Sequence, residues 1–318
     1  MRRYQSLGEL PLGGPRRVVA IGTFDGVHLG HQAVIGLALE RARERGLSAM
    51  VVTFEPNPVS VLRPELAPAV LTEPGFKAAL IERLGADELL VVPFTRAFSR
   101  IRADRFAEML ISAPIGAEVA VIGRNFRFGH GGAGTFESLH AFGHVRGLTV
   151  EAPSMVSSPD GKPISSTRIR RLVSLGQVAD VVPLLRRPHS VEGLVVPGDQ
   201  RGRALGLPTA NVQVHARAAL PGRGVYAGRA VLAEGRYAAA INVGTAPTFT
   251  AGQDGPPVRL EAFLLDYPGG DLYGQRTRIE FLEHLRDEQR FESPDALVAQ
   301  VRDDIARTRE LARSAPAG

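Results

Sequence analysis

Cysteine is absent from the 318 residues of the chain, so disulfide bonds and thiolate metal sites are excluded and the fold must hold through packing alone. Long apolar runs are also missing, since none approaches the roughly 18 residues that a membrane span requires. Residues 1–14 include arginines but no continuous apolar segment behind them, unlike a secretory signal. These absences predict a soluble, cytoplasmic protein that does not associate with membranes.

Aromatic residues are also scarce, and the net charge is small. Aromatics make up 6% of the chain, and 38 basic against 33 acidic residues give a formal net charge of +5. Nucleic-acid binding is therefore not expected, because it relies on basic patches and on stacking platforms. We interpret the surplus arginines as a mixture of solvated surface and anion-binding sites. The composition leaves the oligomeric state open between a monomer and a homo-oligomer.

Two domains are expected from the length and from the 44% apolar content. From Arg17 to about Leu175, short β-branched runs alternate with helical patterns. Such alternation is typical of a parallel sheet covered by helices on both faces. This half is predicted to be an α/β, Rossmann-like domain.

The pattern changes after about Arg187, where short strands are separated by glycine, proline and aspartate without intervening helices. This texture predicts an all-β domain, either a small closed barrel or a sandwich. Ser293 and Pro294 are suited to begin a final helix. The change predicts two domains, 1–186 and 187–318.

The stretch "GTFDGVHLGH" lies between the first predicted strand and the first predicted helix. An open α/β sheet binds ligands at such a loop, and the helix N-terminus attracts anions. Gly22, Gly26 and Gly30 permit the close backbone approach that a phosphate needs. His28 and His31, three residues apart, can lie on one face and donate to a phosphate chain. The alternative is a pair of surface histidines among turn glycines.

This stretch resembles the H-x-G-H signature of the nucleotidyltransferase superfamily. Its longer G-x-F-D-G-V-H-x-G-H form resembles the bifunctional riboflavin kinase/FAD synthetases of bacteria. The resemblance implies that no covalent intermediate forms and that His28 and His31 are catalytic, stabilising the charge that develops on the ATP phosphates as pyrophosphate leaves. It also implies that ATP contacts come from Gly22, Thr23, Phe24, Asp25, Gly30 and Asn57.

A second segment, "ISSTRIRRLVSLG", places three hydroxyls and arginines at a predicted helix start. It resembles the S-S-T-x-I-R motif of the same family, which implies that Ser165, Ser166 and Thr167 grip the ATP phosphates and that Arg168 is catalytic. The alternative is a helix N-cap followed by surface arginines.

The segment "GRNFRFG" resembles the part of the family's adenylylation site that binds the flavin, which implies that Asn125, Phe126 and Phe128 contact it. The glycine run 129–134 that follows lacks the Lys-Ser or Lys-Thr of a P-loop. We expect it to form a mobile loop.

In the second half, "GRALGLPTANV" contains Thr209 and Asn211, whose short oxygen-bearing side chains can ligate a hard cation such as Mg²⁺ together with ATP phosphates. A simple turn before a strand is the alternative. This segment and "GVYAG", "NVGTAPTF", "LEAFLLD" and "LRDEQRF" resemble the riboflavin kinase domain of the family, a Greek-key barrel. The resemblance implies that Gly206 and Pro208 bind ATP and that Arg286 binds the flavin.

The same resemblance implies that Glu261 is the base that accepts the proton of the riboflavin 5′-hydroxyl. Glu261 stands among apolar neighbours in "VRLEAFLL", where an acid needs a reason. An outward-facing strand residue is the alternative, because strand side chains alternate between two faces.

Five positions depart from the family pattern. Asn57 stands where histidine is usual and cannot become cationic. Ala246 replaces a polar residue, Leu207 replaces phenylalanine, and Arg186 and His189 stand where glycine and an aromatic are common.

Together these motifs extend from about residue 17 to 312, and they imply an enzyme with two activities. It would phosphorylate riboflavin to FMN with MgATP and adenylylate FMN to FAD, with riboflavin, FMN and ATP as its small-molecule partners. Two alternatives remain at this point: a paralogue with altered flavin or nucleotide specificity, and a flavin-binding or regulatory protein that has lost an activity.

Overall fold

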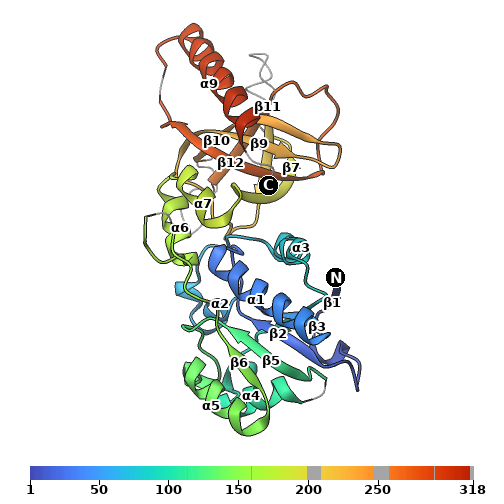
Figure 1. The fold of residues 1–318 in the computed structure, drawn as a ribbon. Coiled ribbons are helices and arrows are strands. Elements are labelled where there is room, and N and C mark those ends of the chain that lie inside the picture. Colours follow the sequence, from blue (N-terminus) through green and yellow to red (C-terminus); the bar gives the residue numbers. More distant parts are fainter. Residues whose placement is uncertain (113, 159, 199–208, 246–257, 290, 316–318) are drawn as a thin grey trace. The chain divides into compact units, whose positions relative to one another are not determined.

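In the computed structural model the chain folds into two compact units (Figure 1). Residues 1–68 and 74–164 form the first unit, and residues 69–73 and 165–318 form the second. The structure describes residues 1–112, 114–158, 160–198, 209–245, 258–289 and 291–315. None of the helices within these ranges has the length and apolar character needed to cross a membrane.

The first unit alternates strands and helices, as predicted. Its strands are β1 (Arg2–Tyr4), β2 (Arg17–Ile21), β3 (Ser48–Glu55), β4 (Glu88–Pro93), β5 (Ala117–Ile122) and β6 (Thr149–Glu151). Its α-helices are α1 (Leu29–Arg45), α2 (Pro58–Leu62), α3 (Pro74–Leu84), α4 (Ala103–Ile111) and α5 (Phe136–Arg146). Short 3₁₀ turns are η1 (Leu7–Glu9), η2 (Pro64–Leu66), η3 (Phe98–Arg100) and η4 (His130–Gly132).

The six strands form one sheet in the order β1-β4-β3-β2-β5-β6, and every neighbouring pair is parallel. The strand order reverses at β2, whose two neighbours are β3 and β5. Ligands of open α/β sheets bind at such a switch point, beyond the carboxyl ends of the strands. The loop after β2 is the histidine-bearing stretch, so the fold places it where the sequence analysis expected a ligand.

Side chains of the sheet are buried on both faces. In β2, Val18 and Ala20 contribute to one core, which also contains buried residues of α1 and α3. Val19 and Ile21 contribute to the opposite core, which contains buried residues of α4 and α5. This two-sided burial explains why the strands are continuous apolar runs rather than alternating patterns.

The second unit is dominated by a closed antiparallel barrel in the order β10-β11-β8-β7-β12-β9. Its elements are α6 (Ser166–Ser174), η5 (Ala179–Val181), α7 (Val182–Leu185), β7 (His189–Val196), β8 (Ala210–Val214), β9 (Gly224–Val231), β10 (Arg236–Thr245), β11 (Val258–Leu264), β12 (Arg276–Arg286) and α9 (Pro294–Ser314). The predicted barrel is confirmed. Ser293 caps the C-terminal helix, since its side chain accepts a hydrogen bond from the backbone N–H of Ala296.

Candidate active sites

His28 and His31 meet at the N-terminus of α1. His28 is the N-cap residue, and its Nδ1 accepts a hydrogen bond from the backbone N–H of His31 at 3.3 Å. The two imidazole rings stack with their centroids 3.6 Å apart, and Phe24 packs edge-on against His31. His28 is 5% exposed, so the surrounding loop holds its ring in place.

The loop between β2 and α1 has an unusual backbone. Phe24, Gly26 and Val27 all have positive φ angles, of 50°, 88° and 41°. Phe24 and Val27 are buried, and this packing offsets the strain of a conformation that side chains rarely adopt. A Cβ on Gly30 would lie 3.2 Å from His28 Cε1, so this glycine makes room for the His28 ring.

Two further predicted ATP-binding residues are Asp25, which lies in this loop, and Asn57, which follows the neighbouring strand β3. Asp25 is 8% exposed. Asn57 follows β3, the strand next to β2, and caps α2, because its Oδ1 accepts a hydrogen bond from the N–H of Val59 at 3.0 Å. An amide at this position therefore serves as a helix cap.

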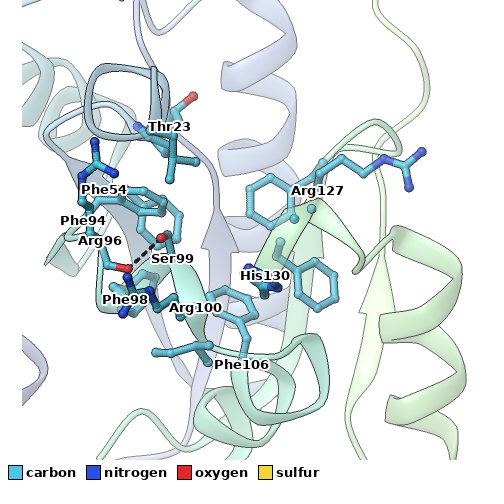
Figure 2. Close-up of a pocket in the computed structure, with 18 residues that line it drawn as sticks. Thr23, Phe54, Phe94, Arg96, Phe98, Ser99, Arg100, Phe106, Arg127 and His130 are labelled. Carbon is cyan, nitrogen blue, oxygen red and sulfur yellow. Dashed lines mark hydrogen bonds between the residues drawn. The ribbon is translucent and has the colours of Figure 1, made fainter. Parts of the chain in front are cut away.

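An aromatic cavity of about 410 Å³ lies beside the histidine-bearing loop and shares Thr23 with it (Figure 2). Six of the 14 phenylalanines of the chain line it, namely Phe54, Phe94, Phe98, Phe106, Phe126 and Phe128. Basic side chains also line it, from Arg96, Arg100, Arg127 and His130. Its size and apolar walls suit a planar ligand with a charged end.

The structure brings only part of the predicted flavin segment into this cavity. Phe126 and Phe128 line it, with ring centroids 6.1 Å apart, whereas Asn125 is exposed and is not among the lining residues. Within the glycine run 129–134, residues 130–132 form the 3₁₀ turn η4. The backbone N–H of His130 donates to the carbonyl of Ile101, and this bond fixes the turn as one wall of the cavity.

Sequence reasoning missed Phe54, Phe94, Phe98 and Phe106. They come from β3, from the segment between β4 and α4, and from α4 itself, and a phenylalanine in such runs resembles a core residue. Their rings pack on one another at centroid distances of 5.7 to 6.5 Å, and the cavity is what distinguishes them from ordinary core.

The hydroxyl-rich segment begins α6, in the second compact unit. Ser165 is the N-cap residue, and its Oγ accepts a hydrogen bond from the N–H of Arg168 at 3.2 Å. Ser166 and Thr167 occupy the first helical turn. Arg170 donates from Nε to the carbonyl of Ala69 at 2.6 Å, which holds residues 69–73 to this unit.

In the barrel, strand pairing joins residues that lie far apart in the sequence. Glu261 of β11 pairs with Asn211 of β8 on one side and with Asn242 of β10 on the other. Arg259 donates from Nε to Asn211 Oδ1 at 3.1 Å and forms an ion pair with Glu261 at 2.9 Å. The guanidinium therefore links the predicted metal ligand to the predicted base.

A cavity of about 310 Å³ in this unit is lined by Thr209, Asn242, Glu261 and Arg286, among others. The neighbours of Glu261 in the strand, Leu260 and Ala262, are buried in the barrel core. The Glu261 side chain is 23% exposed and faces the other way, which resolves the apparent conflict of an acid in an apolar strand.

Arg286, at the end of β12, is held by Asp304 of α9. Its Nε and Nη2 both donate to the Asp304 carboxylate, at distances of 2.8 to 3.3 Å, and its guanidinium lies 5.6 Å from the centroid of the Phe291 ring. Asp304 is 6% exposed. The C-terminal helix thus orients an arginine at the rim of the cavity.

Two of the departures from the family pattern now have a structural account. Arg186 has a φ of 58°, in the left-handed region that glycine adopts most easily. His189 is buried, its Nε2 lies 2.6 Å from the Ala219 carbonyl oxygen, and its ring stacks on Phe281. Burial lowers the pKa of His189 to about 4. Four other positions from the sequence analysis, Gly206, Leu207, Pro208 and Ala246, lie outside the described residues.

An open parallel sheet with a histidine-bearing loop at its switch point, joined to a closed antiparallel barrel, defines a two-domain protein with one candidate site in each domain. Comparison with protein families agrees with this division. The family model described as FAD synthetase matches residues 14–168, and the one described as riboflavin kinase matches residues 185–312.

Curated relatives match nearly the whole chain. A bifunctional riboflavin kinase/FMN adenylyltransferase of Pseudomonas fluorescens is 38% identical over 93% of both chains. That of Escherichia coli K12 is 36% identical over 98% of this chain and 97% of its own. The chain therefore belongs to the family of bifunctional riboflavin kinase/FMN adenylyltransferases. A crystal structure from Streptococcus pneumoniae, described as a macrolide-efflux protein, has a TM-score of 0.85 and 32% identity, covering 96% of this chain and 98% of its own.

Proposed function

We propose that the chain makes flavin cofactors in two steps, phosphorylating riboflavin to FMN and then adenylylating FMN to FAD. The observation that carries this proposal is the similarity over 93 to 98% of the chain to enzymes named for both activities. Both domains are present, so a binding protein or a paralogue of altered specificity is not favoured.

Adenylyl transfer is assigned to the α/β domain. Because His28 Nδ1 accepts from the His31 backbone, a neutral His28 ring carries its proton on Nε2 and can donate it to a phosphate. A phosphate oxygen of FMN attacks the α-phosphorus of ATP, the bond to the β-phosphate breaks, and pyrophosphate leaves. The imidazoles and the N-terminus of α1 stabilise the charge that grows on the leaving group.

The aromatic cavity is assigned to the flavin ring of FMN. Its phenylalanines offer faces on which a planar ring can stack, and its basic residues offer partners for the phosphate. Thr23 belongs both to this cavity and to the loop before His28. An FMN whose phosphate lies at the Thr23 end of the cavity would be held next to the loop that is proposed to bind the ATP phosphates.

Riboflavin phosphorylation is assigned to the barrel. Glu261 accepts the proton of the 5′-hydroxyl as that oxygen attacks the γ-phosphorus of ATP, and ADP leaves. A base at this point contributes by removing the proton as the new bond forms. Arg286, which Asp304 holds in place, is proposed to contact the flavin.

Mg²⁺ is included as the cofactor of this step. The Thr209 hydroxyl and the Asn211 amide oxygen are donors of the type that Mg²⁺ prefers. Asn211 Oδ1 accepts one hydrogen bond from Arg259 and keeps a second lone pair, so the pair fits a cation whose other ligands are ATP oxygens and water. Bound Mg²⁺ neutralises charge on the transferring phosphates.

The proposal includes two domains, 1–186 and 187–318, and a cytoplasmic location. The proposed partners are small molecules, apart from further copies of the chain.

The direct test of the two activities is chromatography of the products after incubation of the purified chain with riboflavin, ATP and Mg²⁺. We expect FMN to appear first and FAD to follow. Formation of neither product would refute the proposal.

A further inference from the structure

Lysine is rare in this chain, and one of its lysines is buried beside the adenylylation site. Of the 38 basic residues only Lys77 and Lys162 are lysines. Lys77 lies in the first turn of α3 and is 5% exposed. Lysine is seldom buried without a partner, because its ammonium loses hydration. Its contacts therefore indicate what the burial achieves.

The Lys77 ammonium contacts two groups. Nζ forms a short ion pair with Glu55 Oε1 at the end of β3, and it donates to the carbonyl oxygen of Thr23 at 3.4 Å. The same carbonyl accepts a second hydrogen bond from Thr53 Oγ1 at 3.1 Å. Thr53 is fully buried. Two buried donors thus fix one backbone carbonyl at the carboxyl edge of the sheet.

That carbonyl opens the loop that presents the histidines. Immediately after Thr23 come Phe24, Gly26 and Val27, with positive φ angles. Left-handed conformations of residues other than glycine are strained, so they persist only where the surroundings hold them. The loop ends at His28, the N-cap of α1. A firm hold on Thr23 therefore limits where the His28 and His31 rings can lie.

We propose that Lys77 is a positioning residue for adenylyl transfer. It acts through Thr23 and Glu55, joining the loop before His28 to the end of β3, from which the chain continues to Asn57. In the part of the chain that the structure describes, the hydrogen bonds and ion pair of Lys77 go to Thr23 and Glu55, neither of which is a predicted catalytic residue. This inference rests on the proposed adenylylation of FMN.

If Lys77 only stabilised the fold, its replacement would lower the melting temperature and would not affect kcat for FAD formation separately. Replacing a buried ion pair by an apolar side chain is often neutral for stability, provided that the remaining charged partner can be hydrated. Glu55 has a side chain that is 30% exposed, so it can be hydrated when Lys77 is removed. Lys77→Met, which keeps the length of the side chain, should then leave the melting temperature close to that of the wild type while catalysis falls.

The experiment measures FAD formation from FMN and ATP, FMN formation from riboflavin, and a thermal melt on the full chain. For Lys77→Met we expect kcat for FAD formation to fall by about 10- to 100-fold, the effect of a small misplacement of catalytic groups. The KM values for ATP and FMN should change much less, and FMN formation should not change. Lys77→Arg should recover part of the lost kcat.

Lys162→Met is the matched control, since Lys162 is the other lysine and its side chain is 72% exposed. If kcat for FAD formation in Lys77→Met equals that of Lys162→Met, the inference is overturned. The proposed function would still stand in that case, provided that the wild type forms FAD. Absence of FAD formation by the wild type would refute both.

If Lys77→Met does not fold, a second variant tests whether the hold on the Thr23 carbonyl matters for catalysis. Thr53→Val removes the other donor to Thr23 with little change of shape. One hydrogen bond of about 1 kcal/mol corresponds to roughly a fivefold loss of kcat for FAD formation. An unchanged kcat in this variant would also overturn the inference.

Discussion

The imidazole rings of His28 and His31 are stacked, with centroids 3.6 Å apart and planes inclined by 18°. This arrangement is built by the backbone: His28 caps α1, the N–H of His31 donates to its Nδ1, and Gly30 leaves space beside the ring. Both rings are therefore oriented before any nucleotide binds. Groups oriented in advance stabilise a transition state without the cost of reorganisation.

His31→Ala removes one ring from this stack. We predict a fall of kcat for FAD formation by about 100-fold, because one donor to the developing charge is lost. The KM for ATP should rise by less. Steady-state kinetics of FAD formation and of FMN formation measure both quantities, and FMN formation serves as the control for folding. An unchanged kcat for FAD formation would contradict the role of the histidine pair.

Glu261→Gln keeps the size of the side chain but removes the base. We predict that FMN formation falls by about 10²- to 10⁴-fold, the usual contribution of a positioned base. FAD formation from supplied FMN should persist. Kinase assays on the full chain test this, and near-normal FMN formation would exclude Glu261 as the base.

His189 should make the barrel unit less stable in acid. Burial lowers its pKa from the usual 6.5 to about 4, so the folded state binds a proton less readily than the unfolded state. The contribution of neutral His189 to the free energy of unfolding is fully present above pH 6.5. It is lost as the pH falls toward 4, and the loss is at most about 3 kcal/mol. Urea unfolding at several pH values measures the slope. His189→Phe should flatten it, whereas replacement of the exposed His144 by Gln should not; an unchanged slope in His189→Phe would contradict this account.

Arg186 is predicted to be a site of backbone strain. Its φ of 58° lies in the left-handed region at the end of α7, where glycine is favoured. Arg186→Gly should be more stable than Arg186→Ala by about 1 kcal/mol, since both lose the same exposed side chain but only alanine retains the strain. Thermal melts of the two variants give the difference. Equal stability would show that this backbone carries no strain.

Much of the fold could be predicted because its physical causes are local. Strands such as β2 are apolar on both faces, which indicates a covered parallel sheet, and the frequent turns after residue 187 indicate antiparallel strands. The histidine-bearing loop was predictable for the same reason, since the residues that form it are contiguous.

The cavities were not predictable in this way. Phe54 and Phe106 approach each other only because the fold brings β3 to α4, and an apolar residue gives no sign in the sequence of whether it faces a core or a ligand. The contact of Glu261 with Asn211 through Arg259 depends on strand register across 50 residues. Resemblance to a family indicated Glu261 and Asn211, but only the three-dimensional fold places them together.

The central claim is that two separate sites in one chain act in sequence, and complementation between two full-length variants tests it most directly. With riboflavin, ATP and Mg²⁺, Glu261→Gln alone should form little FMN, and His31→Ala alone should accumulate FMN without FAD. A mixture of the two should form FAD, because FMN released by one variant is adenylylated by the other. A mixture that forms no more FAD than the two variants do separately would contradict the account.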